Sequence, residues 1–182
     1  MNAILLDRDG VIIRKAPEGE YITDWHDVEF FPEALDAIHL FHRNGYKLIV
    51  VTNQRGVATK KIDINKMHEI HTNIAAAAVK SGGLISAVYY CPHDYTDDCD
   101  CRKPKPGMLF RAAVDHNLVL SNCWMIGDSP SDIAAGKNAG CRTAFISSLD
   151  RYRSCEGCVP DLTDDSLALI ADRIIRSSAA RM

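Results

Sequence analysis

The chain has 182 residues, of which 47% are hydrophobic and 25% are charged, and its formal net charge is -3 at pH 7. This length suits one domain that buries a core without disulfides. The composition is that of an ordinary globular protein, and the slight negative charge argues against an electrostatic nucleic-acid binder, so we expect no nucleic-acid partner.

Apolar and amphipathic patterns alternate along the chain. Five apolar runs predict buried strands at Ala3–Leu6, Leu48–Val51, Leu84–Tyr90, Cys123–Ile126 and Thr143–Ile146. Helical periodicity predicts helices at about 32–44, 63–80, 106–117, 129–140 and 165–176. Strands that alternate with helices predict a Rossmann-like α/β fold, a parallel sheet flanked by helices, in a single domain over 1–182.

Membrane segments are not expected. The N-terminal stretch MNAILLDRDG lacks the basic region, long apolar segment and cleavage site of a signal peptide. Nothing later approaches the roughly 18 apolar residues that a membrane span needs. We therefore expect a cytoplasmic protein with no membrane partner.

Polar residues follow three of the predicted strands. Asp7 and Asp9 follow the first, Thr52 and Asn53 follow the second, and Asp128 follows the fourth. Ligands of parallel sheets bind beyond the carboxyl ends of the strands. Two carboxylates spaced two residues apart point to one side, where one can stay ionised and the other can act as acid and base. Each residue alone is more simply a turn or cap, but together they form the parts of a Mg²⁺-assisted phosphoryl-transfer site.

Three of the seven cysteines crowd with a histidine into residues 91–101. In a reducing compartment such clustering favours a metal over disulfides. Three thiolates and one imidazole suit tetrahedral zinc with no open position, which indicates a structural site formed by Cys91, His93, Cys99 and Cys101. The alternative is a set of reactive or merely exposed thiols.

Four segments resemble the ordered motifs of the haloacid dehalogenase superfamily of phosphatases: LLDRDGV, VVTNQRGVA, CDCRKPKPGM and MIGDSPSDIAAG. The resemblance covers nearly the whole chain, from Leu5 to about Ile146. The cysteine segment is similar to the small zinc-containing branch of that superfamily. The connecting segments are too short for a folded cap domain, so the resemblance implies a capless fold with an open active site, and a monomer.

The resemblance also implies a role for each matched residue. Asp7 would attack phosphorus to form an aspartyl-phosphate, and Asp9 would protonate the leaving group and then activate water. Mg²⁺ would be held by the Asp7 carboxylate, the Asp9 backbone carbonyl and Asp128. Thr52 and Asn53 would position the phosphoryl oxygens.

The basic segment after the cysteines matches a further motif. Lys103 takes the place of the family's charge-stabilising lysine, and Arg102 that of a contact to the substrate phosphate. The zinc loop 91–101 would then be a scaffold for these two cations, whereas the metal that takes part in the chemistry would be Mg²⁺.

The expected substrate is a small phosphorylated molecule. The stretch YITDWHDVEFFPEAL resembles the branch that removes the 7-phosphate of D-glycero-D-manno-heptose 1,7-bisphosphate, which we favour. The gap of five residues between His93 and Cys99 is closer to the histidinol-phosphate phosphatases, so that alternative stays open. A non-catalytic, zinc-stabilised interaction module is a third hypothesis, and the intact set of site residues argues against it.

The remaining reactive residues have plainer interpretations. Cys123 and Cys141 lie at or beside apolar runs and are interpreted as small buried hydrophobes. Cys155 and Cys158 have the spacing of a redox or second metal pair, but two incidental thiols in a loop are favoured. Asp132 is a candidate N-terminal helix acid. Five histidines in helical stretches have no partner at a useful spacing and are interpreted as surface or core residues, namely His39, His42, His68, His71 and His116.

Overall fold

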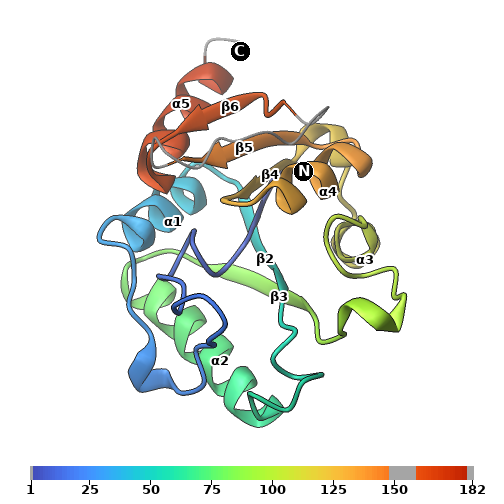
Figure 1. The fold of residues 1–182 in the computed structure, drawn as a ribbon. Coiled ribbons are helices and arrows are strands. Elements are labelled where there is room, and N and C mark those ends of the chain that lie inside the picture. Colours follow the sequence, from blue (N-terminus) through green and yellow to red (C-terminus); the bar gives the residue numbers. More distant parts are fainter. Residues whose placement is uncertain (1, 148–158, 180–182) are drawn as a thin grey trace.

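The structure is a computed structural model that describes residues 2–147 and 159–179. In this part of the chain six parallel strands form one sheet in the order β3-β2-β1-β4-β5-β6 (Figure 1). The strands are β1 (Ala3–Leu6), β2 (Lys47–Asn53), β3 (Ile85–Cys91), β4 (Trp124–Gly127), β5 (Arg142–Ile146) and β6 (Leu162–Asp164). The α-helices are α1 (Ala34–Arg43), α2 (Ile64–Lys80), α3 (Gly107–His116), α4 (Pro130–Asn138) and α5 (Leu167–Ala179).

The helices cover the two faces of the sheet in separate groups. Alternate residues of a strand point to opposite faces, so Ile4 and Leu6 of β1 join one hydrophobic cluster and Leu5 joins the other. The first cluster receives α1, α2 and α5, and the second receives α3 and α4 (Figure 1). The central strand is therefore buried on both faces, which explains its continuous apolar sequence.

The predicted α/β architecture is confirmed, with differences at the ends of elements. The five predicted strands and five predicted helices are all present within a few residues of their expected bounds. The first helix begins at Ala34, two residues after Pro32, and Glu33 makes no side-chain cap hydrogen bond there. Strand β6 was not predicted because it has only three residues, none of them fully buried, at the edge of the sheet.

Several smaller predictions can be compared with this fold. Among residues 2–147 and 159–179, none of the helices is long and apolar enough to cross a membrane. Cys123 and Cys141 are buried, as predicted. Cys155 and Cys158 lie outside the described residues.

Candidate active site

The carboxyl ends of the three central strands meet at one edge of the sheet. Strand β1 lies between β2 and β4, and Leu6 pairs in register with Val50 on one side and Ile126 on the other. The residues that follow these positions therefore come close together. This edge carries Asp7, Thr52 and Asp128, as the sequence predicts.

Lys103 links the first motif to the helix after β4. Its Nζ lies 3.0 Å from Asp7 Oδ1 and 2.6 Å from Asp132 Oδ1, and it donates a hydrogen bond of 2.8 Å to the carbonyl of Val51. The side chain is almost fully buried. Burial alone would lower the pKa of Lys103, but the charges of Asp132 and Asp7 outweigh burial and raise that pKa. Lys103 is therefore a fixed cation beside the Asp7 carboxylate.

Asp132 has two functions in the local structure. Its Oδ2 accepts a hydrogen bond of 3.0 Å from the backbone N–H of Ser129, which closes a capping box at the start of α4. Its other oxygen pairs with Lys103. The residue is fully buried, and burial raises its pKa to about 6 against the opposing charge of Lys103. The helix acid expected from the sequence is thus also part of the charged cluster.

Asp128 has a position that suits a cation. Carboxylate oxygens of Asp7, Asp128 and Asp132 lie within 4.8 Å of one another. Among the described residues, no group hydrogen-bonds to the buried Oδ1 of Asp128, while Oδ2 lies 2.7 Å from Lys15 Nζ. Burial raises the pKa of Asp128, and the Lys15 ammonium opposes that rise. A hard divalent cation would satisfy the unpaired oxygen and the crowded negative charge, so these residues fit Mg²⁺.

The backbone after β1 approaches this cluster closely. Gly10 has a φ of +87°, and a Cβ at this position would lie 2.1 Å from Asp128 Oδ2. Only glycine tolerates both the left-handed conformation and this approach. The glycine of the DRDG turn therefore lets the backbone after β1 pass close to the Asp128 side chain.

Asp9 is held by the side chains of its neighbours. Arg8 Nη2 donates to Asp9 Oδ1 at 3.0 Å and to Oδ2 at 2.9 Å. Gln54 Nε2 donates to Asp9 Oδ2 at 2.9 Å and to Thr52 Oγ1 at 3.0 Å. The Asp9 carboxylate is thus engaged by protein donors, and the metal role predicted for Asp9 concerns its backbone carbonyl instead.

Asn53 contacts the backbone of Lys103. Its Nδ2 donates to the Lys103 carbonyl at 3.1 Å, and its Oδ1 accepts from the Lys103 N–H at 3.1 Å. This pair of hydrogen bonds joins the end of β2 to the basic segment. The side-chain amide therefore fixes the position of Lys103.

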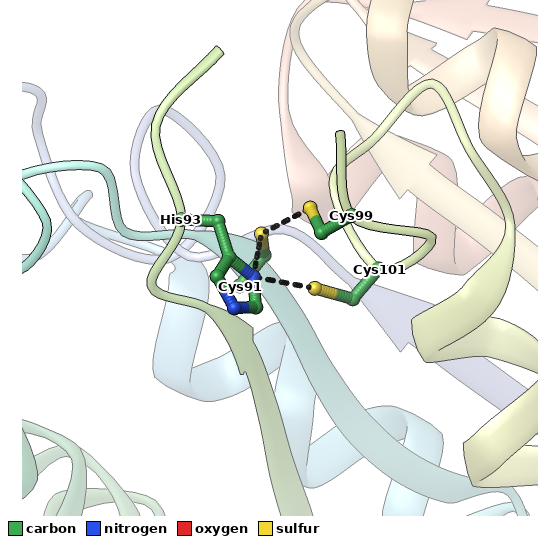
Figure 2. A group of neighbouring side chains, drawn as sticks. All are labelled: Cys91, His93, Cys99 and Cys101. Atoms are coloured by element: carbon green, nitrogen blue, oxygen red, sulfur yellow. Dashed lines mark hydrogen bonds between the residues drawn. The ribbon is translucent and has the colours of Figure 1, made fainter. Parts of the chain in front are cut away.

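The four predicted zinc ligands come together in one group (Figure 2). His93 Nδ1 lies 3.5 Å from Cys91 Sγ and 3.2 Å from Cys101 Sγ, and the sulfurs of Cys91 and Cys99 are 3.6 Å apart. That separation is far longer than the S–S bond of a disulfide, about 2 Å. Zn–S bonds of about 2.3 Å and Zn–N bonds of about 2.0 Å give tetrahedron edges of roughly 3.5 to 3.8 Å. The group therefore has the size and donor set of a zinc site.

The thiols of this group perturb one another. Burial raises the pKa of Cys91 and of Cys101. Burial would also raise the pKa of Cys99, but the backbone N–H of Arg102 and the two neighbouring thiols lower it to about 7. Three thiolates cannot share so small a space unless a cation compensates their charge.

Arg102 extends from the zinc loop over an aromatic ring. Its guanidinium lies 4.3 Å from the ring centre of Tyr95, and its Nη1 donates to the carbonyl of His93 at 3.3 Å. The guanidinium of Arg55 lies 4.6 Å from the same ring. Arg102 and Lys103 both line a cavity of about 230 Å³ beside this loop. The residues after the zinc loop thus line one open space, while the ammonium of Lys103 itself is buried beside Asp7 and Asp132.

Comparisons with known proteins identify relatives of this chain. A family model described as HAD-hyrolase-like matches residues 100–156. D-glycero-beta-D-manno-heptose-1,7-bisphosphate 7-phosphatase of Pseudomonas putida is 34% identical over 177 residues, which cover 96% of this chain and 100% of the relative. The enzyme with the same name from Vibrio cholerae is 36% identical over 151 residues, 79% of this chain and 80% of the relative.

The chain belongs to the haloacid dehalogenase superfamily of phosphatases.

A solved structure is similar to this phosphatase over almost its whole length. It is the D,D-heptose 1,7-bisphosphate phosphatase of B. bronchiseptica in complex with magnesium and phosphate. The TM-score is 0.89 at 29% sequence identity, and the match covers 97% of this chain and 99% of the other.

Sequence reasoning missed several polar residues of this phosphatase site. Arg8, Gln54 and His71 join around Asp9, and Lys15 pairs with Asp128. Gln54 follows a predicted site residue directly, which is a usable signal. His71 carries no such signal, because it lies 63 residues from Arg8 in a helix that looks like an ordinary packing element.

Proposed function

We propose that this phosphatase removes the 7-phosphate of D-glycero-D-manno-heptose 1,7-bisphosphate in a Mg²⁺-dependent reaction. The observation that carries the proposal is the 34% identity, over 96% of this chain and all of the relative, to the Pseudomonas putida enzyme named for that reaction. The match to a heptose bisphosphate phosphatase structure supports it independently.

Asp7 is the proposed nucleophile. Its Oδ1 accepts a hydrogen bond of 2.8 Å from the Arg8 backbone N–H and lies 3.0 Å from Lys103 Nζ. Within the described residues Oδ2 accepts no hydrogen bond, so Oδ2 is the oxygen that we assign to the attack on phosphorus. The bond between phosphorus and the sugar oxygen breaks as the aspartyl-phosphate forms.

Asp9 is the proposed acid and base. It gives a proton to the departing sugar oxygen, and it then takes a proton from the water whose oxygen attacks the phosphorus of the intermediate. Asp7 is thereby released as a carboxylate. Thr52, 1% exposed and bonded to Gln54, is proposed to contact the phosphoryl oxygens.

Mg²⁺ would be held by the Asp7 carboxylate, the Asp9 backbone carbonyl and Asp128. When bound, it offsets the repulsion between the carboxylate nucleophile and the phosphate dianion. Both oxygens of Asp132 are engaged by Lys103 and Ser129, so we assign Asp132 to holding Lys103 in place. Lys103 neutralises charge on the phosphoryl group as it transfers.

The zinc loop is proposed to support this site from outside the reaction. Cys91, His93, Cys99 and Cys101 would complete a four-coordinate zinc, and a closed coordination shell leaves no position for substrate. The zinc would fix the loop that ends in Arg102 and Lys103. Arg102 is proposed to contact a substrate phosphate. The family resemblance assigns Asn53 to the phosphoryl oxygens, but we propose that it acts by holding the Lys103 backbone.

Location and assembly stay predictions. A site that needs three reduced thiols suits a reducing compartment, which supports the expected cytoplasmic location. The expected monomer is tested by light scattering of the purified protein. The hypothesis of a non-catalytic zinc module is set aside, because the relatives over the whole chain are phosphatases.

Substrate choice is tested by measuring kcat/KM on two substrates side by side. With Mg²⁺ present, we expect a clear preference for heptose 1,7-bisphosphate over histidinol phosphate. Asp7→Asn should remove phosphate release from both and serves as the control for contaminating phosphatases. A preference for histidinol phosphate would overturn the proposed substrate and would agree with the short gap between His93 and Cys99.

A further inference from the structure

Arg8 is a buried guanidinium between the two aspartates of the DRDG motif. It is 2% exposed, and its Nε and Nη2 groups are used on the Asp9 carboxylate and on Gln54 Oε1. An arginine stays protonated in a protein, so each of its buried N–H groups needs an acceptor. The acceptor for Nη1 is His71 Nε2, at 2.9 Å.

His71 reaches this position from α2, which otherwise takes no part in the site. The side chain is 8% exposed. Burial and the charge of Arg8 lower its pKa to about 3, so the ring is neutral at ordinary pH. Since arginine can only donate, Nε2 carries the lone pair and Nδ1 carries the proton. His71 is thus a built acceptor for one specific donor.

The groups around His71 leave this pairing undisturbed. The ring centre of Tyr90 lies 5.9 Å from that of His71, and the Tyr90 hydroxyl bonds instead to His68 Nε2 at 2.9 Å. The other charged partner in the group is Asp9, across Arg8. No second acceptor for Arg8 Nη1 is found among the described residues.

We propose that His71 is a positioning residue for Asp9 and that it acts through Arg8. The geometry supports a chain of contacts in which His71 fixes the guanidinium, and the guanidinium fixes both oxygens of the Asp9 carboxylate. Gln54 closes the chain, because it accepts from Arg8 and donates to Asp9. The inference rests on the proposed role of Asp9 as acid and base.

Loss of the acceptor has a defined chemical consequence. Without it, Arg8 Nη1 becomes a buried charged donor with no partner, and the guanidinium must turn to find one. Asp9 moves with it and delivers its proton less well to the departing oxygen. This defect matters for an alkyl phosphate, whose alkoxide is a poor leaving group, but hardly matters for 4-nitrophenyl phosphate, whose phenolate leaves without a proton.

The test compares kcat/KM on heptose 1,7-bisphosphate and on 4-nitrophenyl phosphate, because this constant covers the steps up to departure of the leaving group. General acid catalysis contributes about 10²- to 10⁴-fold. We expect His71→Leu to lower kcat/KM at least about 10-fold on the heptose and less than about 3-fold on the aryl phosphate. His71→Gln, which keeps an acceptor oxygen near the position of Nε2, should restore most of the loss.

Two further variants separate the possible failures. His68→Leu changes a histidine one turn away that does not touch Arg8, and it should leave both constants near wild type. Asp9→Asn must also lose more kcat/KM on the heptose than on 4-nitrophenyl phosphate. Equal losses on the two substrates would refute the role of Asp9. If the wild-type protein released no phosphate from the heptose, the proposed function itself would fail.

The role of His71 is overturned by equal losses on the two substrates, by no loss in His71→Leu, or by a loss that His71→Gln does not restore. If His71→Leu does not fold, as judged by circular dichroism, then His71→Asn takes its place: its shorter amide lies nearer to the position of Nδ1 and cannot replace Nε2. We expect His71→Asn to lose as much kcat/KM on the heptose as His71→Leu does. If its ratio of kcat/KM on the two substrates equals that of the wild-type protein, the inference is refuted.

Discussion

Because His71 is buried and neutral, it makes the free energy of unfolding depend on pH. The substitution His71→Gln should remove this contribution. In the unfolded chain the ring titrates near 6.5, whereas in the fold burial and the charge of Arg8 lower the pKa of His71 to about 3. When a group has a lower pKa in the folded state, the unfolded chain takes up the proton at a higher pH than the folded chain does. The stability that it contributes is therefore present above pH 6.5 and is lost as the pH falls toward 3.

The size of the effect follows from these two values. At pH 7.5 neither state carries the proton, and at pH 5.0 the unfolded chain carries it while the folded chain does not. Because one pKa unit corresponds to about 1.4 kcal/mol, the free energy of unfolding should fall by about 2 kcal/mol over this range on account of His71 alone. The ring is 8% exposed, so solvent screening reduces this value little.

The assay is urea-induced unfolding of wild-type protein and His71→Gln at pH 7.5 and pH 5.0, followed by tryptophan fluorescence. The other titrating groups are common to both proteins, so their contributions cancel in the difference between the two pH dependences. Wild type should lose about 2 kcal/mol more than the variant on acidification. Equal losses in the two proteins would refute a neutral His71 paired with Arg8.

Three other predictions concern the charged site and the zinc loop. Asp9→Asn should lower kcat on the heptose bisphosphate by about 10²- to 10⁴-fold, and an unchanged kcat in a phosphate-release assay would contradict its role. Lys103→Met leaves two buried carboxylates without their cation and should cost about 3 to 5 kcal/mol of stability in urea unfolding. The double variant Lys103→Met/Asp132→Leu should recover part of this loss. If the loss in the double variant equals the sum of the losses in the two single variants, the pairing is refuted. Cys101→Ser should reduce the zinc content found by metal analysis and lower the melting temperature. The control Asp7→Asn should keep the full zinc content. A normal zinc content in Cys101→Ser would rule out the Cys101 thiol as a ligand.

The sequence predicts those parts of the fold in which local pattern and burial coincide. Strands β1 and β4 are buried on both faces, and their unbroken apolar runs leave little choice of structure. Strand β6 escapes prediction because an exposed edge strand of three residues has no such run. The start of α1 is misplaced because proline commonly begins a helix, but here the chain turns for two more residues before the first helical position.

The same limit applies to the site. The positions of Asp7, Thr52 and Asp128 follow from the rule that the carboxyl ends of parallel strands share one edge. The clustering of the zinc ligands follows from their spacing within one loop. The pairing of His71 with Arg8 depends on how α2 packs against the sheet, and no local pattern encodes that approach. The interpretation of His71 as a surface or core residue left its burial open and missed its contact with Arg8.

The most direct test of the account is to trap the intermediate on the enzyme. Wild-type protein is mixed with heptose 1,7-bisphosphate and Mg²⁺, quenched in acid within milliseconds, digested and mapped by mass spectrometry. We predict a phosphoryl group on the peptide that contains Asp7, and none on the same peptide of Asp7→Asn. Product formation with the phosphoryl group on another side chain, or undiminished turnover by Asp7→Asn, would contradict the proposed mechanism.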